Sequence, residues 1–325
     1  MLILGCSEKS GASFTTGDGG SDGDTDGDSD GDSDGDSDAD ADTDTSVHYD
    51  TDTESSYSAP QFPELWYSSG QYLVHIALSE EDGTVEKVTP NPIDGLPIGQ
   101  NCITMLDDGS LVGARLGHAD KLTYFYHVKD PPKDGSKAIW ADLGVMPDEI
   151  MLEGLYTDCD GRLYGMDTGQ DVGSTKGNRL LRFLGNYLEG DFTYEVVSDL
   201  SMAVVADIDD MGPGIDENGD VTDNPGLAID TSNIYDFDYV SGTGTHVANG
   251  GTWGIHVLGG PLFKDKISRI YLLTSGATLH ELDPQTHAVS ETLVTGPQDV
   301  EGNYVGWSGL AGPLTDCETG FPPVL

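Results

Sequence analysis

The sequence predicts an all-β fold of short strands in series, and three observations lead to this prediction. Glycine contributes 44 of the 325 residues and aromatic residues only 8%, which is typical of a turn-rich β protein rather than a helical bundle. From residue 65 onward, short runs of alternating polarity are separated by Asp-Gly, Glu-Gly and Pro-containing turns. No apolar run approaches the ~20 residues that a membrane-spanning helix needs.

The chain is strongly acidic, because 58 Asp and Glu residues against 14 Lys and Arg give a formal net charge of −44. Residues 1–60 hold 17 of the acids and one base, so residues 61–325 still carry 41 acids and 13 bases. This negative field repels phosphate backbones and anionic lipids, which argues against nucleic-acid binding and against a polybasic membrane contact. Cations are the natural partners of such a surface.

The N-terminal segment 1–6 ends in Ile3-Leu4-Gly5-Cys6, which resembles a bacterial lipobox. The resemblance implies that this segment is the end of a signal peptide and that Cys6 carries a lipid anchor. It also implies a place in the bacterial cell envelope, as an outer-membrane lipoprotein at the surface or in the periplasm. The alternative is a chance apolar start with an ordinary cysteine.

Residues 7–60 are predicted to form a disordered linker, because nearly every second residue between positions 17 and 52 is Asp. No apolar residue interrupts positions 22–38, so nothing offsets the entropy lost on ordering. The Asp spacing matches the start of an EF-hand calcium loop, but the required acid at position twelve is replaced by Ser33, Ser37 and Ala41. Weak condensation of calcium is therefore expected here rather than formed sites.

Residues 61–325 are predicted to form one folded domain with an internal repeat. Each repeat combines a short apolar strand, an Asp/Gly turn, a strand containing a Leu-Tyr-like pair and a further strand. In chain order, the repeats are readable in residues 71–88, 103–126, 153–183, 225–238 and 267–287. The interval of 71 residues between Leu163 and Ile234 leaves room for a sixth repeat or a long loop.

The repeat resembles those of β-propellers of the NHL and calcium-dependent gluconolactonase types, over about residues 65–315. The resemblance implies a β-propeller with five or six blades. Residues 306–313 look like an inner strand without outer strands, and residues 65–88 look like outer strands without an inner one. We therefore expect the N- and C-terminal strands to pair and close the ring. A β-sandwich with irregular strand spacing is the alternative.

The densest acidic cluster of the folded part supplies the predicted calcium ligands. Carboxylate and amide oxygens at alternate positions suit Ca²⁺, although a glycine at position four rather than six excludes an EF-hand loop. The alternative is a solvated surface loop that binds no ion. The candidate ligands are Asp207, Asp209, Asp216, Asn218, Asp220 and Asp223.

A second candidate site follows from the gluconolactonase resemblance, which implies an axial Ca²⁺ held by Glu153, Asn224 and Asp238. Its chemistry would be a metal-polarised carbonyl with an acid acting as base. Two departures weaken the match, since Tyr156 stands where the family has Trp and Pro225 is inserted. The alternative is that the two carboxylates satisfy turn amides.

Three cysteines follow Cys6, so at most one disulfide forms among them. If one forms, Cys159 and Cys317 are the expected pair because they have similar neighbours, with one thiol left over, but equivalent positions in separate blades can lie too far apart; the pairing among Cys102, Cys159 and Cys317 stays open. Their spacing does not indicate a metal site.

The sequence thus favours a non-enzymatic, surface-tethered, calcium-binding β-propeller that binds an unidentified protein, glycan or small molecule. The alternative is a calcium-dependent hydrolase of lactones or esters.

Overall fold

The computed structural model describes residues 62–95, 100–116, 122–147, 150–168, 179–199, 208–230, 233–297 and 309–314. The chain divides into two compact units, Met1–Glu54 and Ser55–Leu325, and every described residue belongs to the second. The predicted lipid anchor Cys6 and the acidic linker lie outside the described residues.

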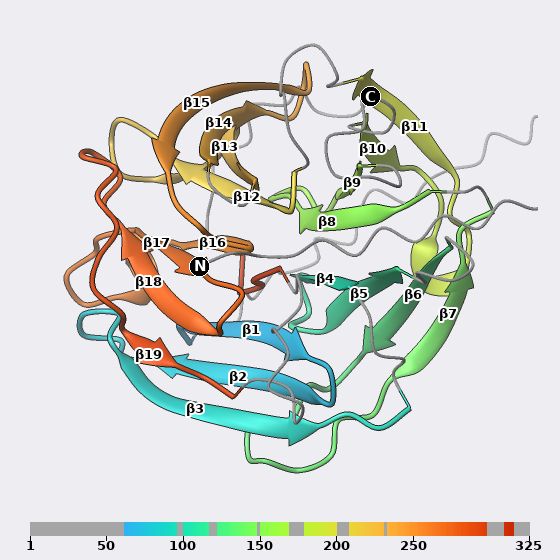
Figure 1. Ribbon diagram of the computed structural model, residues 1–325, viewed down its shortest axis with the longest axis horizontal. Coiled ribbons are helices and arrows are strands. Elements are labelled where there is room, and N and C mark those ends of the chain that lie inside the picture. Colours follow the sequence, from blue (N-terminus) through green and yellow to red (C-terminus); the bar gives the residue numbers. More distant parts are fainter. Residues whose placement is uncertain are drawn as a thin grey trace, which may run out of the picture. The chain divides into compact units, whose positions relative to one another are not determined.

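Ser55–Leu325 forms a five-bladed β-propeller, which confirms the predicted all-β fold and fixes the number of blades. Five antiparallel sheets surround a common centre, with one strand of each sheet nearest to it (Figure 1). The helical content of the described residues is limited to two 3₁₀ turns, Tyr187–Glu189 and Gly260–Leu262. None of the described helices is long and apolar enough to span a membrane.

Each blade consists of consecutive strands. The first blade contains β1 (Glu64–Ser69), β2 (Tyr72–Leu78) and β3 (Val85–Pro92), and the second contains β4 (Gln100–Met105), β5 (Leu111–Leu116), β6 (Thr123–Val128) and β7 (Ala141–Val145). The third blade contains β8 (Leu152–Thr157), β9 (Leu163–Asp167), β10 (Arg179–Phe183) and β11 (Tyr194–Asp199), and the fourth contains β12 (Asp210–Ile215), β13 (Val221–Asp230), β14 (Asn233–Asp238) and β15 (Thr243–Asn249). The fifth blade contains β16 (Gly254–Leu258), β17 (Arg269–Leu273), β18 (Thr278–Leu282) and β19 (Val294–Thr295).

The two ends of the propeller chain pair in the first blade, as the sequence predicted. Ala311 forms an antiparallel bridge with Trp66 of β1. The backbone N–H of Trp66 donates to the Ala311 carbonyl at 2.7 Å, and the Ala311 N–H donates back at 2.9 Å. The C-terminal segment thus supplies the inner strand of a blade whose other strands come from the N-terminal side, which closes the ring.

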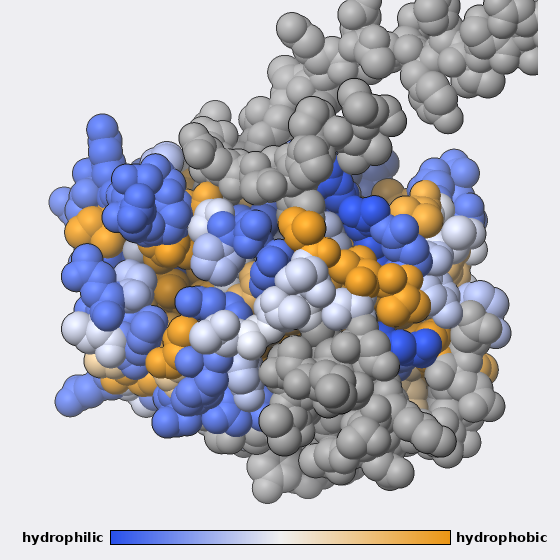
Figure 2. Space-filling view, turned by 90° about the horizontal axis from the view of Figure 1, so that it is seen from above, coloured by the Kyte–Doolittle hydropathy of each residue, from blue (hydrophilic) through white to orange (hydrophobic). Residues whose placement is uncertain are grey.

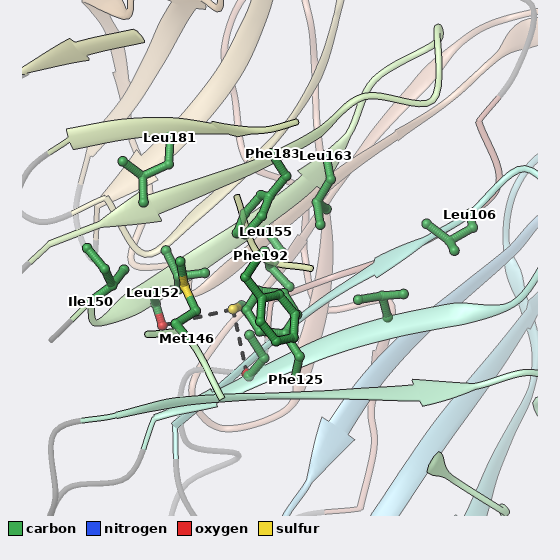
Figure 3. Packing of buried hydrophobic residues seen from close by; sticks show 13 residues of the cluster. Leu106, Phe125, Met146, Ile150, Leu152, Leu155, Leu163, Leu181, Phe183 and Phe192 are labelled. Atoms are coloured by element: carbon green, nitrogen blue, oxygen red, sulfur yellow. Dashed lines mark hydrogen bonds between the residues drawn. The ribbon is translucent and has the colours of Figure 1, made fainter. Parts of the chain in front are cut away.

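Buried apolar side chains fill the spaces between neighbouring blades. Figure 3 shows the cluster between the second and third blades, where Phe125 stacks on Phe192 with ring centroids 4.7 Å apart. The sulfur of Cys102 lies within this cluster, 3.6 Å from the Ala114 carbonyl oxygen. Both faces of a blade lie against neighbouring blades, so strands such as β1, β9, β16 and β17 are buried at every residue. At the surface, hydrophilic side chains are interspersed with small apolar patches (Figure 2).

Glycine is required at two points. The predicted Asp82-Gly83 turn joins β2 to β3, and Gly83 has a φ of +67° with the Tyr271 hydroxyl only 2.4 Å from where a Cβ would lie. Near the centre, a Cβ on Gly254 would lie 2.9 Å from the carbonyl carbon of Gly309. At both points the neighbouring atoms leave no room for a side chain.

We call one end of the propeller the hairpin face. Because the strands of each blade alternate in direction, the connections from first to second strand and from third to fourth strand lie at the same end. The hairpin face comprises the connections 79–84, 106–110, 129–140, 158–162, 184–193, 216–220, 239–242, 259–268 and 283–293.

Contacts at the hairpin face link adjacent blades. The Lys264 N–H donates to the Glu80 carbonyl at 2.6 Å and joins the fifth blade to the first. The Ser268 hydroxyl donates to the Gly219 carbonyl at 2.6 Å and joins the fifth blade to the fourth. These bonds fix the hairpin connections relative to one another, so side chains on them are held in defined positions.

Candidate functional site

The structure does not bring the predicted calcium ligands together. Asp207 lies outside the described residues, and Asp209 is buried just before β12. Asp216, Asn218 and Asp220 follow β12, in the connection at the hairpin face. A strand of six residues spans about 20 Å, so Asp209 is too far from this connection to share an ion with it.

The carboxylate of Asp216 is already engaged by its own turn. Its Oδ1 accepts the backbone N–H of Asp220 at 2.9 Å and that of Asn218 at 2.8 Å, and its Oδ2 accepts the Asn218 amide at 3.0 Å. These bonds lower the pKa of Asp216, since they favour the charged form. The alternate spacing of polar residues thus has a local structural use, and calcium binding at this turn stays a prediction.

Asp223, the last of the predicted ligands, joins two blades. It is fully buried in β13 of the fourth blade, and its Oδ1 accepts the hydroxyl of Tyr156 from the third blade. Its Oδ2 accepts the backbone N–H of Cys159 at 3.0 Å. Burial raises the pKa of Asp223. Both carboxylate oxygens are used inside the protein, which indicates a structural role.

The three residues of the hydrolase alternative lie in different places. Glu153 is half-buried at the start of β8, the end of the strand opposite to the hairpin face. Asn224 is exposed on β13, and Asp238 ends β14 at the hairpin face. The Asp238 carboxylate accepts the backbone N–H of Val240 at 2.8 Å, as expected of a turn residue. The structure does not gather these groups around one axial metal.

No group of three or more His, Cys, Asp or Glu side chains is placed to hold a metal ion in the part of the chain that the structure describes. Among the cysteines, Cys159 is disulfide-bonded, and Cys102 is free and buried. Since Cys6 and Cys317 lie outside the described residues, the pairing of Cys159 with Cys317 stays a prediction.

A cavity that the sequence did not predict lies at the hairpin face of the first blade. Its volume is about 490 Å³, and we call it the Glu64 cavity. Two of its lining residues, Glu64 of β1 and His75 of β2, are only 4% and 5% exposed. The other lining residues are Phe62, Pro63, Ala77, Leu78, Ser79, Glu80, Glu81, Glu86, Lys133 and Lys264.

Glu64 is a buried carboxylate that uses one of its two oxygens. Its Oε2 lies 3.0 Å from Nε2 of His75 and also pairs with the ammonium group of Lys133, from the β6–β7 connection. None of the described residues forms a hydrogen bond or ion pair with its Oε1. Burial by itself raises the pKa of Glu64, but the bonds to His75 and Lys133 outweigh burial and lower it. Glu64 is therefore anionic at neutral pH.

His75 orients Glu64 rather than facing a ligand. Its ring lies against Trp66, with ring centroids 4.6 Å apart. Among the described residues its buried Nδ1 has no hydrogen-bond partner, and its Nε2 is bonded to Glu64. Of this pair, the free oxygen of Glu64 is therefore the group that a molecule in the cavity can bond.

One signal in the sequence could have indicated this site. Glu64 opens β1, a strand in which every residue is buried, and an acid within a run such as Glu64-Leu65-Trp66-Tyr67 has to be paired. Its partner Lys133 could not have been identified, because it lies 69 positions away and in another blade.

No protein-family model and no curated protein matches the chain. Among solved structures, a nidogen/laminin complex is similar at 10% identity over 76% of this chain and 97% of that chain, with a TM-score of 0.44. Inactive virginiamycin B lyase from Staphylococcus aureus, solved with quinupristin, is similar at 15% identity over 70% and 64%, with a TM-score of 0.36. A bifunctional GH43-CE protein from Bacteroides eggerthii is similar at 14% identity over 75% and 36%, with a TM-score of 0.39.

Proposed function

We propose that this chain is a binding module and that the Glu64 cavity is its ligand site. The observation that carries the proposal is the free Oε1 of a buried, anionic Glu64 beside a cavity of about 490 Å³. Burying a carboxylate is costly unless its oxygens are paired, so an unused oxygen at a cavity suits a site that a ligand completes. The cavity volume lies within the range typical of small-molecule and side-chain pockets, about 300–1,000 Å³.

The hydrolase alternative has less support. It requires Glu153, Asn224 and Asp238 around one metal, and these residues lie at different ends of their strands. The Glu64 cavity needs no metal, because it is formed by side chains that the structure places together. Binding is therefore the function that the geometry supports better.

The proposal is tested by melting the full chain with four classes of compound: primary amines, carboxylates, neutral sugars and peptides. One class should raise the melting temperature of the wild-type protein and leave that of Glu64→Gln unchanged. Asp94→Asn is the matched control, since Asp94 is an exposed carboxylate that pairs with Lys137 at 3.0 Å. Equal rises in wild type and Glu64→Gln, or none with any class, would contradict the proposal.

We further propose that the propeller is held at the bacterial outer membrane by a lipid on Cys6 and that residues 7–60 act as the tether. The support is the lipobox-like sequence and the Asp-rich composition. Cys6→Ala, expressed in a Gram-negative host behind a lipoprotein signal peptide of that host, should move the protein from the membrane fraction to the soluble fraction. An unchanged membrane fraction would contradict the lipid anchor.

Calcium binding is a separate proposal, supported by the acidic composition and the oxygen donors near residues 216–220. Calorimetric titration of the full chain with CaCl₂ should show a saturable site that is lost in Asp216→Asn/Asp220→Asn. Diffuse heats that are identical in the two proteins would leave only counterion condensation on the linker.

A further inference from the structure

We infer that the Glu64 cavity binds a primary ammonium group, such as the lysine side chain of a partner protein, at the Oε1 of Glu64, and that Lys133, which pairs with the Oε2 of the same carboxylate, competes with this ligand for its charge. The inference rests on the proposed function, in which the cavity is the ligand site. Four observations support it: the charge of the cavity, the single free oxygen, the apolar wall and the exposure of Lys133.

The charge of the cavity favours a cation. Four glutamates and two lysines line the cavity, and one of the lysines, Lys264, pairs with Glu81 at 3.4 Å. With Lys133 paired to Glu64, the charges of Glu80 and Glu86 remain without an opposite charge among the lining residues. An anion would add to this excess, whereas a cation would reduce it.

The free oxygen favours an ammonium over a guanidinium group. A guanidinium binds a carboxylate best through two parallel hydrogen bonds to its two oxygens. The Oε2 of Glu64 is already bonded to His75, which leaves Oε1 for a single additional donor. A lysine ammonium is a compact point charge that needs only one such oxygen.

The apolar part of the lining suits the hydrocarbon stem of a lysine. Ala77 and Leu78 line the cavity at the end of β2, and Phe62, 59% exposed, lies before β1. Lysine side chains bury their methylene groups against such surfaces while the ammonium group finds a polar partner. A ligand with a charged head and an alkyl stem therefore matches both parts of the cavity.

Lys133 already shows how an ammonium group binds here. Its side chain is 45% exposed, and among the described residues its only ion pair is with Glu64. The half-exposed ammonium group of Lys133 can return to water without crossing the protein interior, and the ligand then pairs with the buried Glu64 in its place. When an ammonium ligand replaces it, the charge beside Glu64 is conserved. Lys133 therefore competes with the ligand and lowers its apparent affinity.

The test uses a blocked pentapeptide with a central lysine, Gly-Gly-Lys-Gly-Gly, and the same peptide with an Nε-acetylated lysine. Both are titrated by calorimetry into the full-length wild-type protein, Lys133→Ala, Lys137→Ala and Glu64→Gln. Lys137→Ala is the matched control, since it removes a lysine from the same connection, one that pairs with exposed Asp94 instead.

We expect the lysine peptide to bind Lys133→Ala about tenfold more tightly than wild type, because the internal competitor is gone. Lys137→Ala should bind like wild type, Glu64→Gln should lose binding, and the acetylated peptide should bind none of the proteins. If Glu64→Gln fails to fold, Glu86→Gln replaces it and should weaken binding about threefold through lost attraction to the charge.

Equal affinities of Lys133→Ala and Lys137→Ala, or binding of the acetylated peptide, would overturn the ammonium inference. A Glu64-dependent rise in melting temperature with a carboxylate or sugar would also overturn it, but would leave the proposed binding function standing. The absence of any Glu64-dependent ligand would overturn the proposed function itself.

Discussion

Two buried carboxylates at the hairpin face, Asp223 and Glu64, each join neighbouring blades, and they differ in how they are satisfied. Asp223 uses both oxygens, for the Tyr156 hydroxyl and the Cys159 amide. Glu64 uses one oxygen, for His75 and Lys133, and it lines a cavity. Burial raises the pKa of Asp223, whereas His75 and Lys133 lower the pKa of Glu64. The same chemical group thus stabilises the fold in one place and is open to a ligand in the other.

The largest expected effect on stability comes from removing the carboxylate of Asp223, both oxygens of which are bonded within the protein. Asp223→Ala leaves a buried hydroxyl and a half-buried amide without their acceptor and should lower the free energy of unfolding by about 3 kcal/mol. Denaturant unfolding measures this difference. Asp238→Ala is the control, since that residue is half-buried, bonds only within its own turn and should cost less than about 1 kcal/mol. Equal losses in the two variants would remove the contrast on which the structural role of Asp223 rests.

A smaller effect is expected from pH, through Asp158, which lies in the β8–β9 connection near Asp223. Burial, and to a lesser extent the charge of Asp223, raise the pKa of Asp158 to about 6. Between about pH 4 and 6 the folded protein therefore binds more protons than the unfolded chain, so stability rises as the pH falls through 6. We expect a gain of roughly 1 kcal/mol between pH 7 and pH 5.

The pH effect is measured by unfolding at both pH values in wild type and Asp158→Asn. The variant keeps an oxygen for the backbone N–H groups of Asp160 and Arg162 but cannot take up the proton. Its stability should change less with pH than that of the wild type. An identical pH dependence would assign the effect to the overall negative charge instead.

The carboxylate of Glu64, which bonds the protein through one oxygen only, should contribute less to stability than that of Asp223. Glu64→Gln keeps the shape of the side chain and an acceptor for His75, and the Lys133 ammonium group that loses its partner is half-exposed, so the free energy of unfolding should fall by only about 1 kcal/mol. Denaturant unfolding beside Asp223→Ala gives the comparison directly. A loss as large as that of Asp223→Ala would show that Glu64 is structural too.

The smallest effect is expected for chemical modification of Cys102, which lies in the buried apolar cluster between the second and third blades. Burial raises the pKa of its thiol well above the usual value, which keeps it protonated. Iodoacetamide at pH 8 should therefore leave Cys102 unmodified in the folded protein and modify it in guanidinium chloride, as read by mass spectrometry. Rapid modification of the folded protein would show that this blade boundary opens.

The sequence predicted the architecture well, because strand length, turns and ring closure are local or repeated features. The Asp82-Gly83 turn and the pairing of residues 309–314 with β1 are examples. The use of individual acidic residues could not be predicted from the sequence, because an acidic run does not reveal which carboxylate oxygens are bonded within the fold. Asp216 and Asp223 are satisfied by turn and inter-blade bonds, and the pairing of Glu64 with Lys133 depends on how two blades meet.

The most direct test of the central claim is the melting temperature of Lys133→Ala and of Lys133→Ala/Glu64→Gln with and without the lysine pentapeptide. Both proteins lack the internal competitor and differ only in the open carboxylate. The account predicts that the peptide raises the melting temperature of the first and leaves that of the second unchanged. The same rise in both proteins would contradict it, because the peptide would then bind without Glu64.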